Sequence, residues 1–144
     1  MRKLIAAESL AGLVGLALVG LGVVGFAPGA VQGYGGLVWW KSGSGAQLFN
    51  LLQTSILLNL VHIGFGVTGL VAARRWTTAR AYLTAGGTAF FALGIYGLLV
   101  DYVSGWNFLP FDRADDWLHI GLGIGMLYAG LAAGLGAFRP AASS

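Results

Sequence analysis

The only two histidines of the chain lie in two similar twelve-residue segments. Residues 59–70 read NLVHIGFGVTGL and residues 116–127 read DWLHIGLGIGML, so His62 and His119 hold matching positions. Both segments are apolar enough to lie in a membrane, where an ionisable ring is costly and marks a candidate functional site. A neutral imidazole donates one hydrogen bond and accepts another, and it can also ligate a metal or a haem iron. The pair is therefore the first candidate for chemistry.

Each histidine has a polar neighbour about one turn before it and a glycine about one turn after it, at spacings that share a helix face. Small residues let membrane helices approach closely, and polar side chains hydrogen-bond across such contacts. The favoured interpretation is that both histidines form hydrogen bonds between helices. The neighbours are Asn59 and Gly66 beside His62, and Asp115, Asp116 and Gly123 beside His119.

Three other interpretations stay open. A haem or another tetrapyrrole would use His62 and His119 as cofactor-binding ligands, with glycines where the macrocycle passes. A zinc or manganese site would combine His119 with Asp115 and Asp116, although consecutive carboxylates do not easily face one point, so we expect no metal. A proton or ion conduit would depend on the histidines and Glu8, without a chain of carboxylates between the two faces. We expect no catalytic residues, because no nucleophile–base pair or cofactor fingerprint is present.

The composition is typical of a membrane-embedded protein. Of the 144 residues, 57% are hydrophobic and 9% are charged, whereas a soluble domain carries about 25% charge. Apolar segments at about 4–27, 56–73, 81–103 and 117–138 approach the roughly 20 residues needed to cross a bilayer. Backbone groups in lipid must pair within their own segment. We therefore expect an all-α integral membrane four-helix bundle, with residues 1–144 forming a single transmembrane domain. The absence of cysteine excludes disulfides and thiolate chemistry.

The basic residues predict the orientation of this bundle. Six of them lie at the two ends of the chain and in the second connection, and two lie in the other connections, so we expect both termini in the cytoplasm. The first apolar segment follows a basic start, as in a signal peptide, but it is longer than the usual apolar region, and we expect it to be retained. The six are Arg2, Lys3, Arg74, Arg75, Arg80 and Arg139, and the two are Lys41 and Arg113.

The histidine segments belong to a longer internal repeat. A constant offset of 57 residues pairs Asn50 with Asn107 and His62 with His119. Both copies contain a helix that runs from the outside to the inside, so the repeats are parallel. We therefore predict two helical hairpins related by a pseudo-two-fold axis along the membrane normal.

The repeat also predicts where these helices begin. Ser55 and Asp112 are expected N-caps, and Asp115 at the third helical position favours the positive end of the helix dipole. Each histidine follows its cap by seven residues, about 10 Å along the helix, so the two rings are expected at one depth in the outer leaflet.

Before the second span, segment 48–54 is expected to form a short interfacial element or an extra helical turn, and segment 29–46 is expected to form an outer loop.

Three motifs resemble a known family. They are N-x-V-H-x-x-x-G-x-x-G at 59–69, A-R-x-Y at 79–82 and N-F-x-P-x-x-x-A-D-x-W-L-H at 107–119. Together they resemble a family of small bacterial four-span membrane proteins known only as a domain of unknown function, over about residues 20–134. The resemblance implies the four-helix fold and the matched histidines. It implies no activity. The expected location is the bacterial cytoplasmic membrane.

The expected function is a non-catalytic one. Few polar or ionisable side chains lie within the predicted spans, so we expect a small scaffold or accessory subunit of a larger membrane complex. Its partners would be the lipid bilayer and other membrane subunits or copies of itself. Nucleic acid is not expected, because no basic stripe with interleaved aromatic residues lies outside the spans. No cofactor is expected, and the alternatives are a tetrapyrrole-binding protein and a small transporter or ion conduit.

Overall fold

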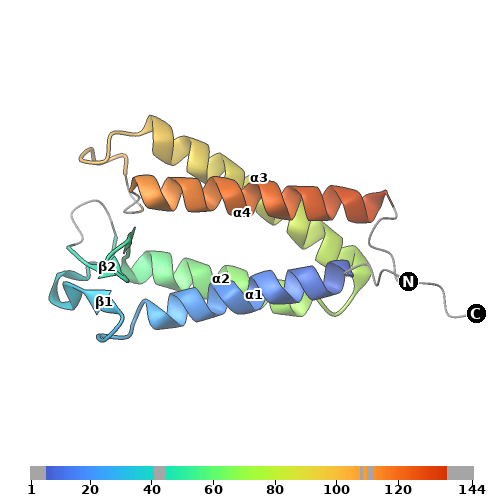
Figure 1. Cartoon of the computed structure of the whole chain (residues 1–144), viewed down its shortest axis with the longest axis horizontal. Helices are drawn as coiled ribbons and strands as arrows, with labels where there is room; N and C mark the ends of the chain where they lie inside the picture. Colours follow the sequence, from blue (N-terminus) through green and yellow to red (C-terminus); the bar gives the residue numbers. More distant parts are fainter. Residues whose placement is uncertain (1–5, 41–44, 108, 110–111, 136–144) are drawn as a thin grey trace, which may run out of the picture.

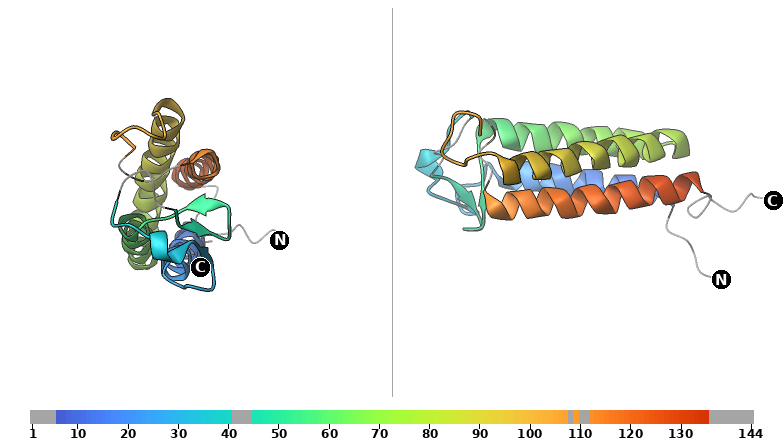
Figure 2. Two further views of the ribbon diagram at one scale, coloured as in Figure 1. Left: turned by 90° about the vertical axis from the view of Figure 1, so that its left-hand side faces the viewer. Right: turned by 90° about the horizontal axis from the view of Figure 1, so that it is seen from above.

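The computed structural model describes residues 6–40, 45–107, 109 and 112–135. Within this part of the chain, four α-helices run along one long axis (Figure 1). Helix α1 packs beside α2, and α3 packs beside α4, and these two pairs hold most of the helix–helix contacts (Figure 2). The end that carries the strands and the α3–α4 connection is called the loop end below. The helices are α1 (Ala7–Val24), α2 (Ile56–Ala72), α3 (Trp76–Leu99) and α4 (Arg113–Gly134).

Three of the four described helices have the length and composition of membrane spans. Helices α1, α3 and α4 are long and apolar enough to cross a bilayer. Helix α2 is apolar but has 17 residues, or about 26 Å at 1.5 Å per residue, slightly less than the bilayer core of about 30 Å. The chain is therefore mostly helical and has the character of a membrane protein.

Several helix ends differ from the predicted apolar segments. Helix α3 begins at Trp76 and not at 81, because its first turn is polar but still helical. It ends at Leu99 and not at 103, because a turn follows in which Ser104 N donates to Asp101 O at 3.0 Å. Helix α4 begins at Arg113, four residues before the apolar segment and directly after Asp112, the predicted N-cap. The outer ends of the first and last predicted segments, 4–5 and 136–138, lie outside the described residues.

The loop between α1 and α2 contains a small antiparallel sheet, which the all-α prediction did not include, in a chain that is otherwise mostly helical. Its strands β1 (Val31–Gln32), β2 (Gln47–Leu48) and β3 (Leu52–Gln53) pair in that order. Segment 48–54 therefore forms parts of two strands and the turn between them, and it does not form an extra helical turn. Phe49 and Asn50 make this turn with positive φ angles of 51° and 57°. A 3-10 helix, η1 (Tyr34–Gly36), follows β1.

The sheet covers the loop end of α1. Val31, Ala46 and Leu48 are buried together and pack against Leu21 and Val24 of α1. Burying these side chains removes apolar surface from water, which is the main favourable term in docking such a loop. The sheet thereby fixes the connection that leads into α2 and its histidine.

Glycines allow the two members of each helix pair to approach closely. A Cβ atom added to Gly66 of α2 would lie 2.6 Å from both Gly15 O and Val19 N of α1. A Cβ atom added to Gly123 of α4 would lie 2.8 Å from Phe91 Cα of α3. Backbone atoms therefore occupy the space that any side chain would need. This is the packing expected where small residues bring membrane helices together.

Candidate functional site

The two histidines lie in the interior, between the helix pairs. His62 on α2 is 6% exposed and His119 on α4 is 2% exposed. Their ring centroids are 6.2 Å apart, and the ring planes are stacked at 19°. Phe90 of α3 stacks on His119 at 5.5 Å and 14°. The structure therefore brings the two predicted residues together and adds a third flat ring to them.

Helix caps set the positions of both histidines. Ser55 Oγ accepts a hydrogen bond from Leu58 N at 3.1 Å at the start of α2. At the start of α4, Asp112 Oδ1 accepts from Ala114 N at 2.8 Å and from Asp115 N at 3.0 Å. Asp115 Oδ2 accepts from Asp112 N at 3.3 Å, which completes a capping box. The predicted caps are the observed ones, and each histidine follows its cap by seven residues.

Asn59, one turn before His62, joins α2 to the end of α1. It is 2% exposed. Its Nδ2 donates to Gly25 O at 2.9 Å, and its Oδ1 accepts from Thr54 Oγ1 at 2.7 Å. An amide that is buried and satisfied in this way holds two backbone segments together. Its contacts are therefore structural.

Asp115 joins the two halves of the chain at the loop end. Gln53 N, in strand β3, donates to Asp115 Oδ2 at 3.1 Å. The same carboxylate belongs to the capping box of α4, and the side chain is 3% exposed. Its Oδ2 thus accepts from two backbone N–H groups, which satisfies donors that would otherwise be unpaired in the interior. Asp115 therefore ties the sheet of the α1–α2 loop to the first turn of α4.

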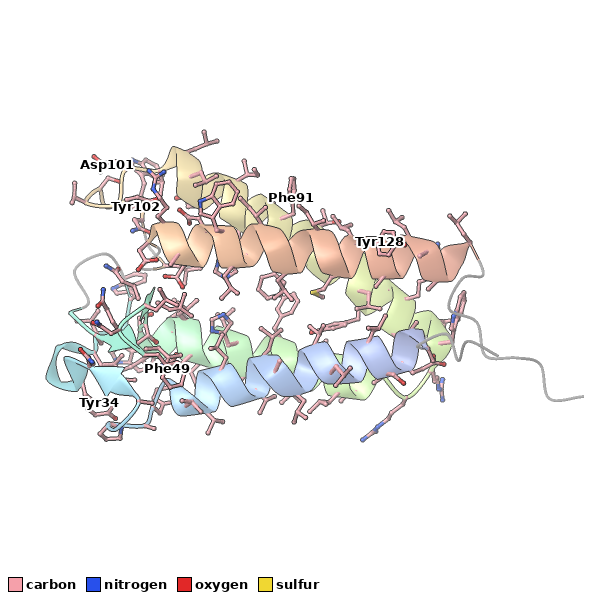
Figure 3. All side chains as sticks on the ribbon, in the orientation of Figure 1. Tyr34, Phe49, Phe91, Asp101, Tyr102 and Tyr128 are labelled. Atoms are coloured by element: carbon pink, nitrogen blue, oxygen red, sulfur yellow. The ribbon has the colours of Figure 1, made fainter. Side chains whose placement is uncertain are left out.

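Asp116, one position further on, receives a hydrogen bond from the α3–α4 connection. Tyr102 OH donates to Asp116 Oδ2 at 2.7 Å, and Figure 3 places Tyr102 beside the start of α4. This hydrogen bond, together with partial burial and the negative charge of Asp116, raises the pKa of the Tyr102 phenol above its ordinary value. Asp116 Oδ1 is buried and has no hydrogen-bond partner among the described residues.

A partly open pocket of about 480 Å³ adjoins the histidines. Helix α1 supplies one wall, which includes Leu13 and Leu18, and α4 supplies the opposite wall. His62, Phe90 and His119 line the same pocket. His62 Nδ1 is buried and has no hydrogen-bond partner among the described residues. The pocket can therefore place an apolar molecule against two imidazoles and a phenyl ring.

The candidate residues do not assemble a metal centre. Within the described residues, no group of three or more histidine or acidic side chains is placed to hold a metal ion. Asp115 and Asp116 instead bond to Gln53 N and to Tyr102 OH, in different directions. The suggested site of His119 with both aspartates is therefore not formed here.

The sequence reasoning missed several residues that build this region. Phe90 carries no pattern that separates it from an ordinary core residue. The sequence does show a weak echo between the first and third helices, G-x-x-G at 22–25 and at 94–97, but it is too weak to carry a prediction alone. A Cβ atom at Gly94 would meet Asp116 O at 2.7 Å. The first glycines of this echo, Gly22 and Gly94, are therefore places where the backbones of paired helices lie in close contact.

The fold and this site define a helical membrane protein with a buried pair of histidines between two glycine-packed helix pairs. A family model described as "Domain of unknown function (DUF4383)" matches residues 9–132, and the chain belongs to this family. The match includes all four predicted spans in whole or in part, both histidines and their polar neighbours. No curated protein and no solved structure matches the chain.

Proposed function

We propose that this chain is a non-catalytic membrane protein that serves as a small accessory subunit of a larger membrane assembly. The observation that carries the proposal is the use of its buried and half-buried polar side chains. Asn59, Asp112 and Asp115 bond to backbone groups that join helices or cap them. Asp116 accepts from Tyr102 of the neighbouring connection. Side chains that are engaged in this way support a structural role.

Four crossings with both termini in the cytoplasm agree best with the distribution of charge. Arg74, Arg75 and Arg80 lie together around the α2–α3 turn, at the end opposite the loop end. A basic cluster of this kind favours the cytoplasmic side. Exposed tryptophans at the loop end suit the membrane–water interface, where such side chains collect. They are Trp39, Trp40, Trp106 and Trp117. The membrane would be a bacterial cytoplasmic membrane.

Single cysteines test this topology, because the chain has none of its own. Gly35→Cys and Gly105→Cys would lie at the loop end, where an added Cβ meets nothing within 4 Å. Thr77→Cys would lie at the opposite end. A membrane-impermeant thiol reagent should label the first two in intact spheroplasts and the third only after permeabilisation. Labelling of Thr77→Cys in intact spheroplasts contradicts the proposed orientation.

Duplicated hairpins related by a pseudo-two-fold axis would explain the matched glycine contacts of the two helix pairs. Added Cβ atoms at matched glycines of α1 and α3 would meet matched atoms of α2 and α4. In each pair, one contact is a carbonyl oxygen three residues before the histidine, and another is the residue directly after it. The matched contacts are Gly22 with Asn59 O and Ile63, and Gly94 with Asp116 O and Ile120.

Recovery of partners from the native membrane tests the accessory role. A tagged copy of the chain would be crosslinked in cells, extracted in mild detergent and analysed by native electrophoresis and mass spectrometry. We expect a complex that contains other membrane subunits or several copies of this chain. A tagged protein of similar size from another family serves as the control. Recovery of this chain alone, as a monomer, contradicts the proposal.

The tetrapyrrole alternative receives less support from the geometry. The lone pair of an imidazole nitrogen lies in the plane of the ring, whereas the rings of His62 and His119 are stacked with their planes at 19°. Axial ligation of one iron by both residues would therefore require the rings to turn. An absorption spectrum tests it directly. A Soret band in the wild-type protein that is lost in His62→Ala would establish the tetrapyrrole. A wild-type protein without a Soret band would exclude this alternative.

A further inference from the structure

We propose that the groove between α1 and α4 binds a neutral, lipid-soluble amphiphile whose flat head carries carbonyl or hydroxyl oxygens, as a quinone with an alkyl or isoprenoid tail does. The head would lie at His62 and His119. The tail would follow the groove away from the loop end, toward the start of α1. This goes beyond the accessory role, because it assigns a ligand to a surface that this role does not use.

The groove consists of two adjoining pockets. The pocket of about 480 Å³ holds the histidines, and a second pocket of about 280 Å³ lies further along the same two helices. Val14 of α1 and Leu122 of α4 line both pockets, so the two adjoin at these side chains. Their combined size falls in the range of small-molecule sites, which is about 300–1,000 Å³.

The histidine end of the groove suits a flat head that accepts or donates hydrogen bonds. His62 is 94% buried, and its Nδ1 has no hydrogen-bond partner among the described residues. A buried polar atom without a partner is costly, and a ligand oxygen that reached it after a rotation of the ring toward the pocket would relieve the cost. His119 and Phe90 lie beside it as nearly parallel rings. Flat rings are favourable stacking surfaces for another planar group.

The remainder of the groove suits an apolar tail. No charged side chain lines either pocket among the described residues. A charged head would therefore be buried without a partner, which is strongly unfavourable. Gly121 and Gly125 leave the wall of α4 open, because a Cβ added to either meets nothing within 4 Å. These glycines make room along the helix, in contrast to Gly123, which packs against α3.

The groove is accessible from the side that would face lipid. Leu13 of α1 and Leu118 of α4 line the larger pocket and are 61% and 43% exposed. A molecule dissolved in the bilayer can therefore reach the histidines without crossing water. This access favours a membrane-dissolved ligand over a water-soluble one.

Binding of a radiolabelled decyl-substituted dimethoxybenzoquinone to the protein in phosphatidylcholine nanodiscs tests the proposal, with empty nanodiscs as background. Gly125→Leu adds a side chain at a position of the groove where a Cβ meets nothing within 4 Å, and we expect it to raise Kd at least about tenfold. Gly64→Leu is the matched control, because Gly64 also faces open space but lines neither pocket. We expect its Kd to stay within about twofold of the wild-type value.

A second variant tests the role of the head. His62→Leu should weaken quinone binding about tenfold, the loss of roughly one hydrogen bond to a buried group. Binding of decylbenzene, which has a flat head without oxygen, should be unchanged in this variant. Thermal unfolding of each variant shows that a loss of binding is not a loss of fold.

Three results would overturn the assignment. One is wild-type binding no higher than that of empty nanodiscs. Another is unchanged quinone affinity in both Gly125→Leu and His62→Leu. The third is loss of a copurifying protein in Gly125→Leu when the wild-type protein binds no quinone, which would make a partner helix the occupant. The last result would leave the accessory role intact, so the two proposals fail separately.

Discussion

Replacement of Gly66 by alanine should destabilise the protein, whereas replacement of Gly64 should not. A Cβ atom at position 66 would lie 2.6 Å from Gly15 O and Val19 N. Ordinary contacts are about 3.5 Å or longer, so α1 and α2 would have to separate by about 0.9 Å. At position 64 the added Cβ meets nothing within 4 Å.

The expected difference follows from two opposing effects. Overpacking of this kind costs about 1–3 kcal/mol. Alanine is also favoured over glycine in a helix by about 1 kcal/mol, which both variants gain. Gly64→Ala should therefore be more stable than the wild type by up to about 1 kcal/mol, and Gly66→Ala should be less stable than Gly64→Ala by about 1–3 kcal/mol.

Reversible unfolding in SDS, followed by circular dichroism, measures the free energy of unfolding of each variant. The second helix pair offers an independent copy of the experiment, with Gly123→Ala as the tight site and Gly121→Ala as the open one. The reasoning is refuted if Gly66→Ala is as stable as Gly64→Ala. Unequal behaviour of the two copies, with a penalty at 66 and none at 123, would count against matched packing in the two halves.

Three further predictions concern the loop end. Asn59→Ala should lower the free energy of unfolding by about 1–3 kcal/mol, because Gly25 O loses its donor; an unchanged SDS unfolding curve would contradict this. Asp112→Ala should cost about 1 kcal/mol and speed hydrogen exchange in the first turn of α4, and unchanged exchange there would argue against the cap. Tyr102 should ionise above the ordinary tyrosine pKa of about 10, because its proton is held by Asp116. Its stabilising contribution should be complete below that pH and fall as the pH rises through the raised pKa, so the ultraviolet titration of Tyr102→Phe should lack this late step.

Helix positions were predictable where capping chemistry marks them. Ser55 and Asp112 are short polar residues directly before apolar runs, and both are N-caps in the structure. Those caps set the place of each histidine along its helix. Ends inferred from hydropathy alone were wrong by several residues, as at Trp76, because side-chain polarity changes at the membrane surface while the backbone hydrogen bonds continue.

The loop sheet was not predictable by the same reasoning. Its strands are two residues long, too short for an alternating pattern to develop. Its turn uses Phe49 in a left-handed conformation, which is uncommon for an aromatic residue. The sheet forms because Val31 and Leu48 bury themselves on α1, a tertiary contact that local sequence does not encode.

The candidate site was predictable in part. The duplicated segment pointed to His62 and His119 as a pair, and glycine spacing pointed to close helix contacts. The stacking of Phe90 on His119 and the groove beside α1 depend on how the two helix pairs meet. No spacing along the sequence contains that information.

A crosslink between positions 62 and 119 tests the central feature of this account most directly. In a chain without native cysteine, His62→Cys and His119→Cys would be combined and treated with a short bifunctional thiol reagent in the membrane. Rings whose centroids are 6.2 Å apart predict efficient crosslinking within one chain. The control pair His62→Cys with Tyr128→Cys should not crosslink, because Tyr128 is 70% exposed on α4. Equal yields from the two pairs, or no crosslink between 62 and 119, would contradict a histidine pair enclosed between the helix pairs.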